Sequence, residues 1–182
     1  MQNRYRKITY FSVFFALTFI VQFIGFPPPY TGPLVNMMLF LTVSYLGIPS
    51  GILLGSLTPV IALWRGELPG NLAPMVPFIM LGNALLAAGY GLVLSKFKWL
   101  FSRENVFWTR VHESAAVLTG AFLKFIFFSF GVRFIIPYIV MDVNAQNKAV
   151  AIFSIFQLIT AIAGGILALI IGNFLKRLKH TV

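Results

Sequence analysis

Residues 64–74 of the chain read WRGELPGNLAP and form the most polar break in an otherwise apolar first half. The runs on both sides are hydrophobic enough to cross a lipid bilayer. Two glycines and two prolines prevent a continuous helix through the break, because proline removes a backbone donor and glycine favours irregular backbone. We therefore expect a short hydrophilic loop at one membrane face, where two membrane helices meet and where Arg65, Glu67 and Asn71 offer polar groups.

The composition of the whole chain predicts an integral membrane protein. Hydrophobic residues make up 59% and charged residues 10% of the 182 positions, which is too little polar surface for a water-soluble globule. A crossing needs about 20 apolar residues, so six helices use nearly the whole chain as one membrane domain, 1–182. We predict an all-α bundle with transmembrane helices at about 8–26, 34–46, 51–64, 73–95, 114–138 and 149–174.

The distribution of positive charge predicts the orientation of this bundle. The formal net charge is +10, but the Lys and Arg residues cluster at the ends of apolar runs, where they orient helices with the basic segments inside the cell. We predict that both termini are cytoplasmic, and that the charge does not mark a nucleic-acid-binding surface. Residues 96–113 are expected to lie at the cytoplasmic interface, and the proline-rich residues 27–33 to form an extended external loop.

The residue inventory argues against catalysis. The chain has no cysteine and only two histidines, His112 and His180, far apart in the sequence, so neither a metal centre nor a resident cofactor is expected. The sequence contains no G-x-x-x-x-G-K-[ST] phosphate loop and no combination of nucleophile and base typical of hydrolases. These observations favour a binding protein over an enzyme.

Polar side chains share a layer near the middle of the predicted membrane domain. At about 1.5 Å of rise per residue, Asn83, Lys124 and Gln157 lie roughly 15 to 20 Å below the external ends of their helices. Further polar residues come nearer to the external surface: Asn36, Arg65, Glu67, Asn71 and Arg133. A cavity open to the outside is the simplest arrangement that keeps these groups solvated or paired.

Each of these residues also has a structural interpretation. Lys124 lies where a lysine costs roughly 3 kcal/mol to insert, and it either contacts a ligand, snorkels to the surface, or pairs with Glu67 or an amide of the same layer. Arg133 either contacts the ligand or reaches external headgroups. Arg65 and Glu67 either face the ligand or form an ion pair within the loop. The amides at mid-depth either contact the ligand or join helices.

Aromatic residues near the polar loops add a surface on which a ring can stack. Combined with the cations and amides, they predict a small polar ligand with an anionic or carbonyl-rich end, such as a water-soluble vitamin or its precursor, in preference to a metal ion or a lipid. The full set of predicted ligand-binding residues is Tyr30, Asn36, Trp64, Arg65, Glu67, Asn71, Asn83, Lys124, Arg133 and Gln157.

A separate pattern in the first helix predicts a protein partner. Ser12 and Ala16 are small residues four positions apart, on a helix whose other positions are mostly bulky and apolar. Small residues at this spacing let two membrane helices approach closely. We expect a partner membrane helix to lie in this groove.

The predicted architecture resembles the substrate-binding S components of energy-coupling factor (ECF) vitamin importers. The resemblance rests on six helices, basic termini, the small-residue pair Ser12 and Ala16, and external polar loops after helices one and three. It implies a compact S-component-like bundle in a bacterial or archaeal cytoplasmic membrane. It also implies high-affinity capture of a micronutrient from outside, with transport carried out by a transmembrane coupling subunit and two cytoplasmic ATPases.

Two other classes of function are compatible with the membrane signature. A membrane scaffold or assembly protein has no need for a polar layer at mid-depth. A self-sufficient transporter is expected to show internal repeats with broken helices, and the two halves of this sequence show no convincing repeat. The polar layer therefore favours the substrate-binding subunit.

Overall fold

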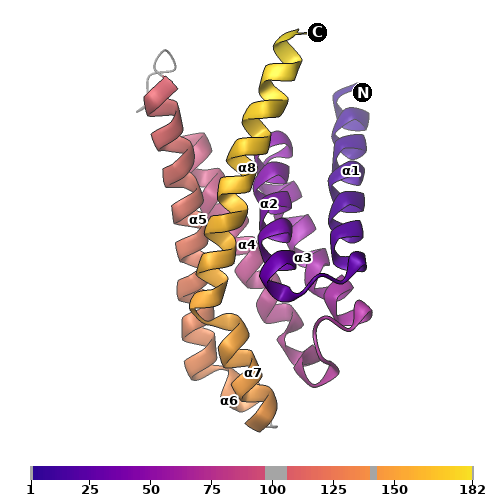
Figure 1. Cartoon of the computed structure of the whole chain (residues 1–182), viewed down its shortest axis with the longest axis vertical. Helices are drawn as coiled ribbons and strands as arrows, with labels where there is room; N and C mark the ends of the chain where they lie inside the picture. Colours follow the sequence, from indigo (N-terminus) through magenta and orange to yellow (C-terminus); the bar gives the residue numbers. More distant parts are fainter. Residues whose placement is uncertain (1, 97–105, 140–142, 182) are drawn as a thin grey trace.

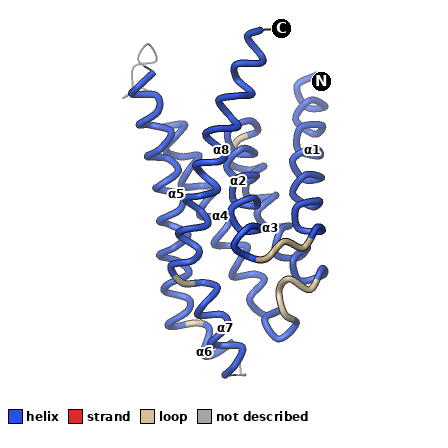
Figure 2. Tube along the Cα trace, in the orientation of Figure 1, coloured by secondary structure: helices blue, strands red, loops and turns tan. Residues whose placement is uncertain are grey.

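The computed structural model describes residues 2–96, 106–139 and 143–181. All regular elements in these ranges are helical: α1 (Gln2–Ile24), α2 (Pro28–Leu46), α3 (Ile48–Arg65), the 3₁₀ helix η1 (Gly70–Met75), α4 (Val76–Lys96), α5 (Val106–Phe134), α6 (Ile136–Ile139), α7 (Val143–Phe153) and α8 (Ile155–Thr181). The predicted all-α class is confirmed within the described residues. Figure 2 shows that the described connections between helices are short.

The long helices lie side by side along one axis (Figure 1). Both chain termini are at the same end of the bundle, and α6 and α7 are at the opposite end. We call the half that contains the termini the terminal half and the other the far half. Since α1 starts in the terminal half and runs away from it, the connection from α1 to α2 and the loop after α3 both belong to the far half.

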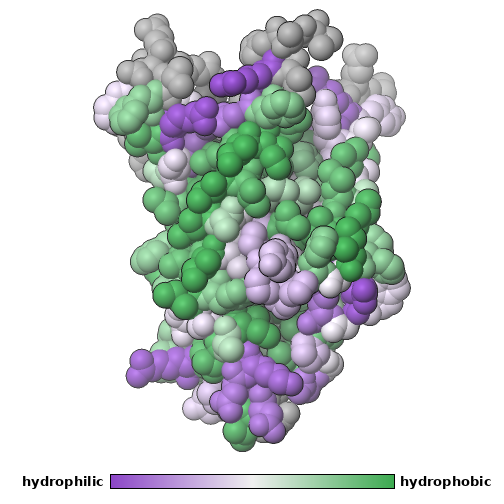
Figure 3. Space-filling view, viewed as in Figure 1, coloured by the Kyte–Doolittle hydropathy of each residue, from purple (hydrophilic) through white to green (hydrophobic). Residues whose placement is uncertain are grey.

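Five segments of the described chain are long and apolar enough to cross a membrane. They are Arg4–Ile24, Ile48–Arg65, Gly70–Lys96, Phe107–Phe134 and Gln146–Leu175. Figure 3 shows apolar side chains in a broad zone between two more polar ends of the molecule. These features indicate a multi-pass membrane protein.

The remaining predicted crossing corresponds to α2, which is less apolar. Its first half carries three prolines together with Thr31 and Asn36. This helix packs against α1, α3, α4 and α8, and ten of its residues are buried. A helix enclosed by other helices does not need an apolar surface on every side, because it meets little lipid. Five helices, rather than the six predicted, therefore have the composition of a crossing.

The start of α2 corrects the prediction for residues 27–33. They were expected to form an extended loop, yet the helix already begins at Pro28. Pro28 and Pro29 occupy its first two positions, where the missing N–H of proline has no intrahelical partner to lose and its fixed φ suits a helix. These prolines start the helix instead of excluding it.

The predicted helix at 149–174 is divided in the structure. It is replaced by α7 and α8, which are separated at Ser154, and α7 begins within the segment that was predicted as an external loop. The Ser154 hydroxyl donates to the carbonyl of Ala151 at 3.1 Å, a local bond that competes with regular helical bonding.

The helix predicted at 114–138 has different bounds in the structure: α5 begins earlier, at Val106, and ends at Phe134 before α6. Residues 97–105 of the predicted interfacial segment lie outside the described residues, whereas Lys96 ends α4 and residues 106–113 form the start of α5.

The central loop is confirmed as a break between two helices. Gly66 ends α3 in the left-handed conformation, with φ of 83°, which glycine adopts without steric cost. The chain then turns through residues 66–69 into η1. The polar stretch thus joins α3 to α4 in the far half, as its glycines and prolines predicted.

The helices α4 and α5 approach each other closely on the terminal side of the cavity. A methyl group at Gly120 of α5 would lie 2.7 Å from the carbonyl oxygen of Leu86 on α4, and one at Gly89 of α4 would lie 3.3 Å from the Cα of Gly120. Leu39, Phe40 and neighbouring residues fill the core beside this contact. The glycines allow α4 and α5 to pack at a separation that any larger side chain would prevent.

Candidate functional site

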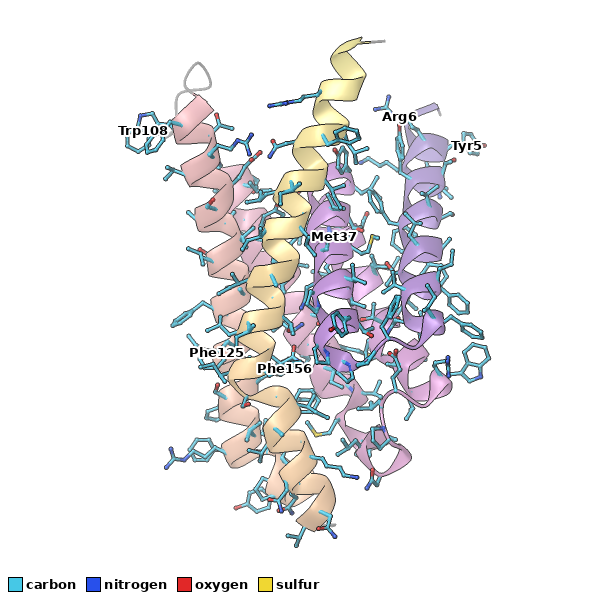
Figure 4. The ribbon with its side chains drawn as sticks, viewed as in Figure 1. Tyr5, Arg6, Met37, Trp108, Phe125 and Phe156 are labelled. Atoms are coloured by element: carbon cyan, nitrogen blue, oxygen red, sulfur yellow. The ribbon has the colours of Figure 1, made fainter. Side chains whose placement is uncertain are left out.

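A cavity of about 400 Å³ lies in the far half of the bundle. Helices α1 to α5, α7 and α8 all contribute to its lining, together with the connection from α1 to α2 and the loop after α3. Phe156, labelled in Figure 4 near the start of α8, belongs to this lining. The polar residues of the lining are Gln22, Thr31, Asn36, Thr58, Glu67, Asn83, Lys124, Gln157 and Thr160.

The structure brings together half of the residues that the sequence predicted for ligand binding. Their common feature is that each lies on a wall of the same cavity, although they come from four helices and one loop: Asn36, Glu67, Asn83, Lys124 and Gln157. The residues of the predicted layer, Asn83, Lys124 and Gln157, therefore line one common cavity. That these residues bind a ligand stays a prediction.

Lys124 is the most deeply buried charge in the described part of the chain. Only 4% of its surface is exposed, and its Nζ donates to Oδ1 of Asn36 at 2.9 Å. The ring of Phe128 lies 5.7 Å from the same nitrogen. Among the described residues no carboxylate pairs with it, so its protein partners are a neutral amide and an aromatic ring. A buried ammonium held in this way retains the capacity to attract an anion.

Asn83 belongs to a second connected group of polar side chains on the cavity. Its Nδ2 donates to the carbonyl of Gly55 at 2.9 Å and to the hydroxyl of Thr58 at 3.0 Å. Gln22 of α1 joins the same group, because its Nε2 donates to the carbonyl of Thr58 at 3.0 Å. These bonds tie α1, α3 and α4 together beside the cavity.

Gln22 was not predicted to belong to the site, although the sequence carries a signal for it. Gln22 is an amide within a run of apolar residues, less than one turn from the end of α1. It is 3% exposed, and its Oε1 has no hydrogen-bond partner among the described residues. A buried amide oxygen without a partner is uncommon, and in this structure it marks a wall of the cavity.

Glu67 reaches the cavity from the loop after α3. Burial raises the pKa of this carboxyl group, and the nearby positive charge of Arg65 opposes the shift. Its Oε1 is buried without a hydrogen-bond partner within the described chain. Arg65 is near enough to act on Glu67 through its charge, and its Nε donates to the carbonyl of Phe23 at 3.1 Å.

The other five predicted ligand residues lie outside the lining. Trp64 is 71% exposed and contacts the rings of Phe19 and Phe23 on the outside of the bundle. Arg65 holds the end of α1 through the bond to Phe23. The remaining three, which lack contact with the cavity, are exposed: Tyr30, Asn71 and Arg133.

The position of Arg133 shows that depth along a helix does not by itself predict which residues line the cavity. It lies on the same helix as Lys124 and was expected on the same descending polar surface. Its side chain is exposed, with the guanidinium carbon 6.0 Å from the ring of Phe134. Nine positions on a helix correspond to two and a half turns, so a residue at that distance points to the opposite face.

The chemistry available in the cavity is that of binding. The lining provides an ammonium, a carboxylate, amides and hydroxyls around apolar side chains. Across residues 2–96, 106–139 and 143–181, no group of three His, Cys, Asp or Glu side chains is placed to hold a metal ion. The arrangement suits hydrogen bonding to a small molecule of mixed polarity.

Comparison of the chain with protein-family models, with curated proteins and with solved structures gave no match. Its function is therefore inferred from its own residues.

Proposed function

We propose that this protein is the high-affinity substrate-binding subunit of an ATP-driven importer of the ECF type, and that it captures a small water-soluble micronutrient from outside the cell. The observation that carries the proposal is the cavity of about 400 Å³ with the buried Lys124 in its wall. A purely structural bundle gains nothing from enclosing an ammonium without an acidic partner, because an unpaired buried charge is destabilising. An anionic or carbonyl group of a ligand would supply the missing partner.

The size and lining of the cavity support a small-molecule ligand. Sites for such ligands usually measure about 300–1,000 Å³ and combine apolar walls with a few polar groups. Here Phe153, Phe156 and Ile79 provide apolar surface between the polar residues. A metal ion would leave most of this volume empty, and a long lipid chain would exceed it.

The proposed orientation places the cavity towards the outside. Basic residues described in the terminal half are Arg4, Arg6, Lys7, Lys96, Arg110 and Arg177, and those in the far half are Arg65, Lys124, Arg133 and Lys148. Figure 4 shows Arg6 and Trp108 near the same end as the termini. The excess of positive charge favours a cytoplasmic terminal half, which leaves the far half and its cavity on the external side.

The proposed partner contact lies on α1. Ser12 and Ala16 are both exposed, and α1 contacts the rest of the bundle on only one side, mainly through α2 and α3. A membrane helix of a coupling subunit can approach this pair closely because neither residue has a large side chain. Two cytoplasmic ATPases acting through that subunit would supply the energy, since the chain itself has no phosphate loop.

The contact on α1 can be tested without knowing the substrate. Ser12→Leu and Ala16→Leu are expected to reduce co-purification with the coupling subunit while leaving the cavity unaffected, because each adds bulk only on the outer surface. Val13→Leu, an exposed position beside the pair that is already bulky, is the matched control. An unchanged yield of the complex with both leucine variants would exclude this docking face.

Mass spectrometry of small molecules that co-purify with the protein tests the function itself. We expect a water-soluble compound at close to one molecule per chain, lost in the variant Lys124→Met. Uptake of the identified compound into liposomes should require the coupling subunit, the ATPases and ATP. Uptake by this chain alone would instead establish a self-sufficient transporter, and the absence of any bound molecule would favour a scaffold.

A further inference from the structure

One side of the cavity presents hydrogen-bond donors. Lys124 of α5 uses one of its three hydrogens on Oδ1 of Asn36. Asn36 of α2 keeps both hydrogens of its Nδ2, for which the described chain provides no acceptor. Gln157 of α8 lines the same side, and its side-chain amide, which can donate or accept, makes no hydrogen bond within the described residues. We call α2, α5 and α8 at this level the donor wall.

A second part of the lining presents acceptors. Asn83 donates to Gly55 and to Thr58 through its Nδ2, so its remaining free group is Oδ1. Thr58 has given its own hydroxyl hydrogen to the carbonyl of Gly55 at 3.0 Å. Gln22 has an unpaired Oε1, and so has Glu67. We call α1, α3, α4 and the loop after α3 at this level the acceptor wall.

The other two hydroxyls of the lining do not change this division. Thr31 donates to the carbonyl of Phe26 at 2.6 Å, and Thr160 donates to the carbonyl of Gln157 at 3.2 Å. Neither has a hydrogen left for a ligand. The donors that remain are those of Lys124, the amides beside it and the second hydrogen of Gln22 Nε2.

Helix contacts separate the outer parts of the two walls. In the donor wall α5 packs against α8, and in the acceptor wall α1 packs against α3, while α2 and α4 lie between these two pairs and contact both. The hydrogen bonds described above connect residues of the same wall. Apolar side chains such as Phe156 and Ile79 lie on the cavity between the polar groups.

From this separation we infer that the cavity binds a compact molecule with two unlike ends: an anionic or carbonyl group that faces Lys124 and Asn36, and an N–H or amine group that faces Gln22 and Glu67. The inference rests on the proposed function and specifies the class of its substrate. One cation on one wall and one carboxylate on the other match a ligand that is itself amphoteric, with no net charge left unbalanced.

Ligands with only one polar end fit less well. A simple acid satisfies Lys124 but leaves the oxygens of Gln22 and Glu67 without donors, and a simple amine leaves the ammonium without an anion. Buried polar groups that stay unpaired on binding reduce affinity. A ligand that pairs with both walls avoids both losses.

The test uses three ring compounds of similar size and the full-length protein in detergent. The compound 4-(aminomethyl)benzoate has both ends, 4-ethylbenzoate has only the anion, and 4-isopropylbenzylamine has only the amine. Dissociation constants are measured by ligand-observed NMR. We expect the two-ended compound to bind about tenfold or more tightly than either single-ended one, as one additional charged hydrogen bond would give.

Variants of Gln22 and Glu67 test whether the acceptor wall causes the tighter binding of the two-ended compound. Gln22→Leu and Glu67→Gln should each weaken binding of 4-(aminomethyl)benzoate and leave binding of 4-ethylbenzoate unchanged. Using two variants on different elements keeps the test decisive if one of them does not fold. Ser95→Ala, at an exposed site near the other end of α4, should leave binding of all three compounds unchanged.

Equal or tighter binding of a single-ended compound would overturn the inference, and so would a failure of 4-(aminomethyl)benzoate to bind. Tight binding of 4-ethylbenzoate alone would leave the proposed function intact, because a cavity that captures an anion suffices for it. Failure of the proposed function would appear separately, as uptake by the chain without ATPases or as the absence of a co-purifying molecule.

Discussion

In the terminal half of the bundle, α4 and α5 meet through Gly89 and Gly120. In the far half, the same two helices carry Asn83 and Lys124 on the walls of a cavity. The first region is closed by the smallest side chains, and the second contains costly polar groups around unfilled volume. Close packing in one half can stabilise the bundle while the other half keeps polar groups that reduce stability. Functional sites often cost stability in this way.

The strongest test of this contrast removes the buried charge. Lys124→Met keeps most of the apolar stem, so the fold should survive, while affinity for the co-purifying molecule should fall by about 2 to 5 kcal/mol through loss of a desolvated charge contact. Calorimetric titration gives the affinity and thermal unfolding gives the stability.

Arg133→Met is the matched control for that change, since it removes a cation from the same helix at an exposed site outside the cavity. Its affinity should equal that of the unmodified protein. Near-normal affinity in Lys124→Met would show that the lysine does not contact the ligand. Loss of folding together with binding would identify Lys124 and Asn36 as a structural pair.

The second test disturbs the closed region. In Gly120→Val the new Cβ lies 2.7 Å from the carbonyl oxygen of Leu86, and a backbone atom cannot move aside without separating α4 from α5. Overpacking of this kind typically costs about 1–3 kcal/mol, so the midpoint of thermal unfolding in detergent should fall clearly.

Gly70→Ala provides the comparison for this variant, because no atom lies within 4 Å of its added carbon. Its unfolding midpoint should stay close to that of the unmodified protein. If Gly120→Val is equally harmless, the terminal half is not tightly closed and the contrast between the halves fails.

The smallest expected effect concerns Glu67 and pH. Because burial raises the pKa of this carboxyl group in the folded protein, the folded state binds its proton more strongly than the unfolded state does. The contribution of Glu67 to stability is therefore greatest below the ordinary glutamate pKa of about 4.3 and decreases as the pH rises towards the higher folded value. Above that value its ionisation is a net cost.

Glu67→Gln removes this titration. The variant should be slightly more stable than the unmodified protein near neutral pH, and the difference should vanish as the pH falls below about 4. Thermal unfolding followed across that range measures it. A variant that is less stable at neutral pH would mean that the ionised carboxylate has a stabilising partner.

The candidate site could be predicted where two constraints acted together. Asn83, Lys124 and Gln157 are polar residues deep in apolar helices, and a polar group in that position requires a partner or a cavity. Their positions along the helices set their depth, and all three line the cavity. The prediction was weaker near the helix ends, where a side chain can reach water in several directions.

Trp64 and Gln22 illustrate that weakness in opposite ways. Trp64 belongs to the polar loop region and was assigned to the site, yet it stacks on the outer surface of α1. Gln22 was overlooked in an apolar run, yet it lies on the cavity. Depth in the membrane follows from the number of residues to a helix end, whereas the direction of a side chain also depends on how the helix is rotated against its neighbours.

The sequence by itself determined the all-helical class, the apolar character of the long helices, the break at residues 64–74 and the positions of Asn83, Lys124 and Gln157 along their helices. Each of these depends only on composition or on position along one helix. The tertiary structure alone decided that α2 is enclosed by other helices, that Asn36 reaches Lys124, and that Glu67 and Lys124 line the same cavity. These features require the rotation and packing of several helices at once, and such contacts between residues distant in sequence leave no periodic pattern in a single chain.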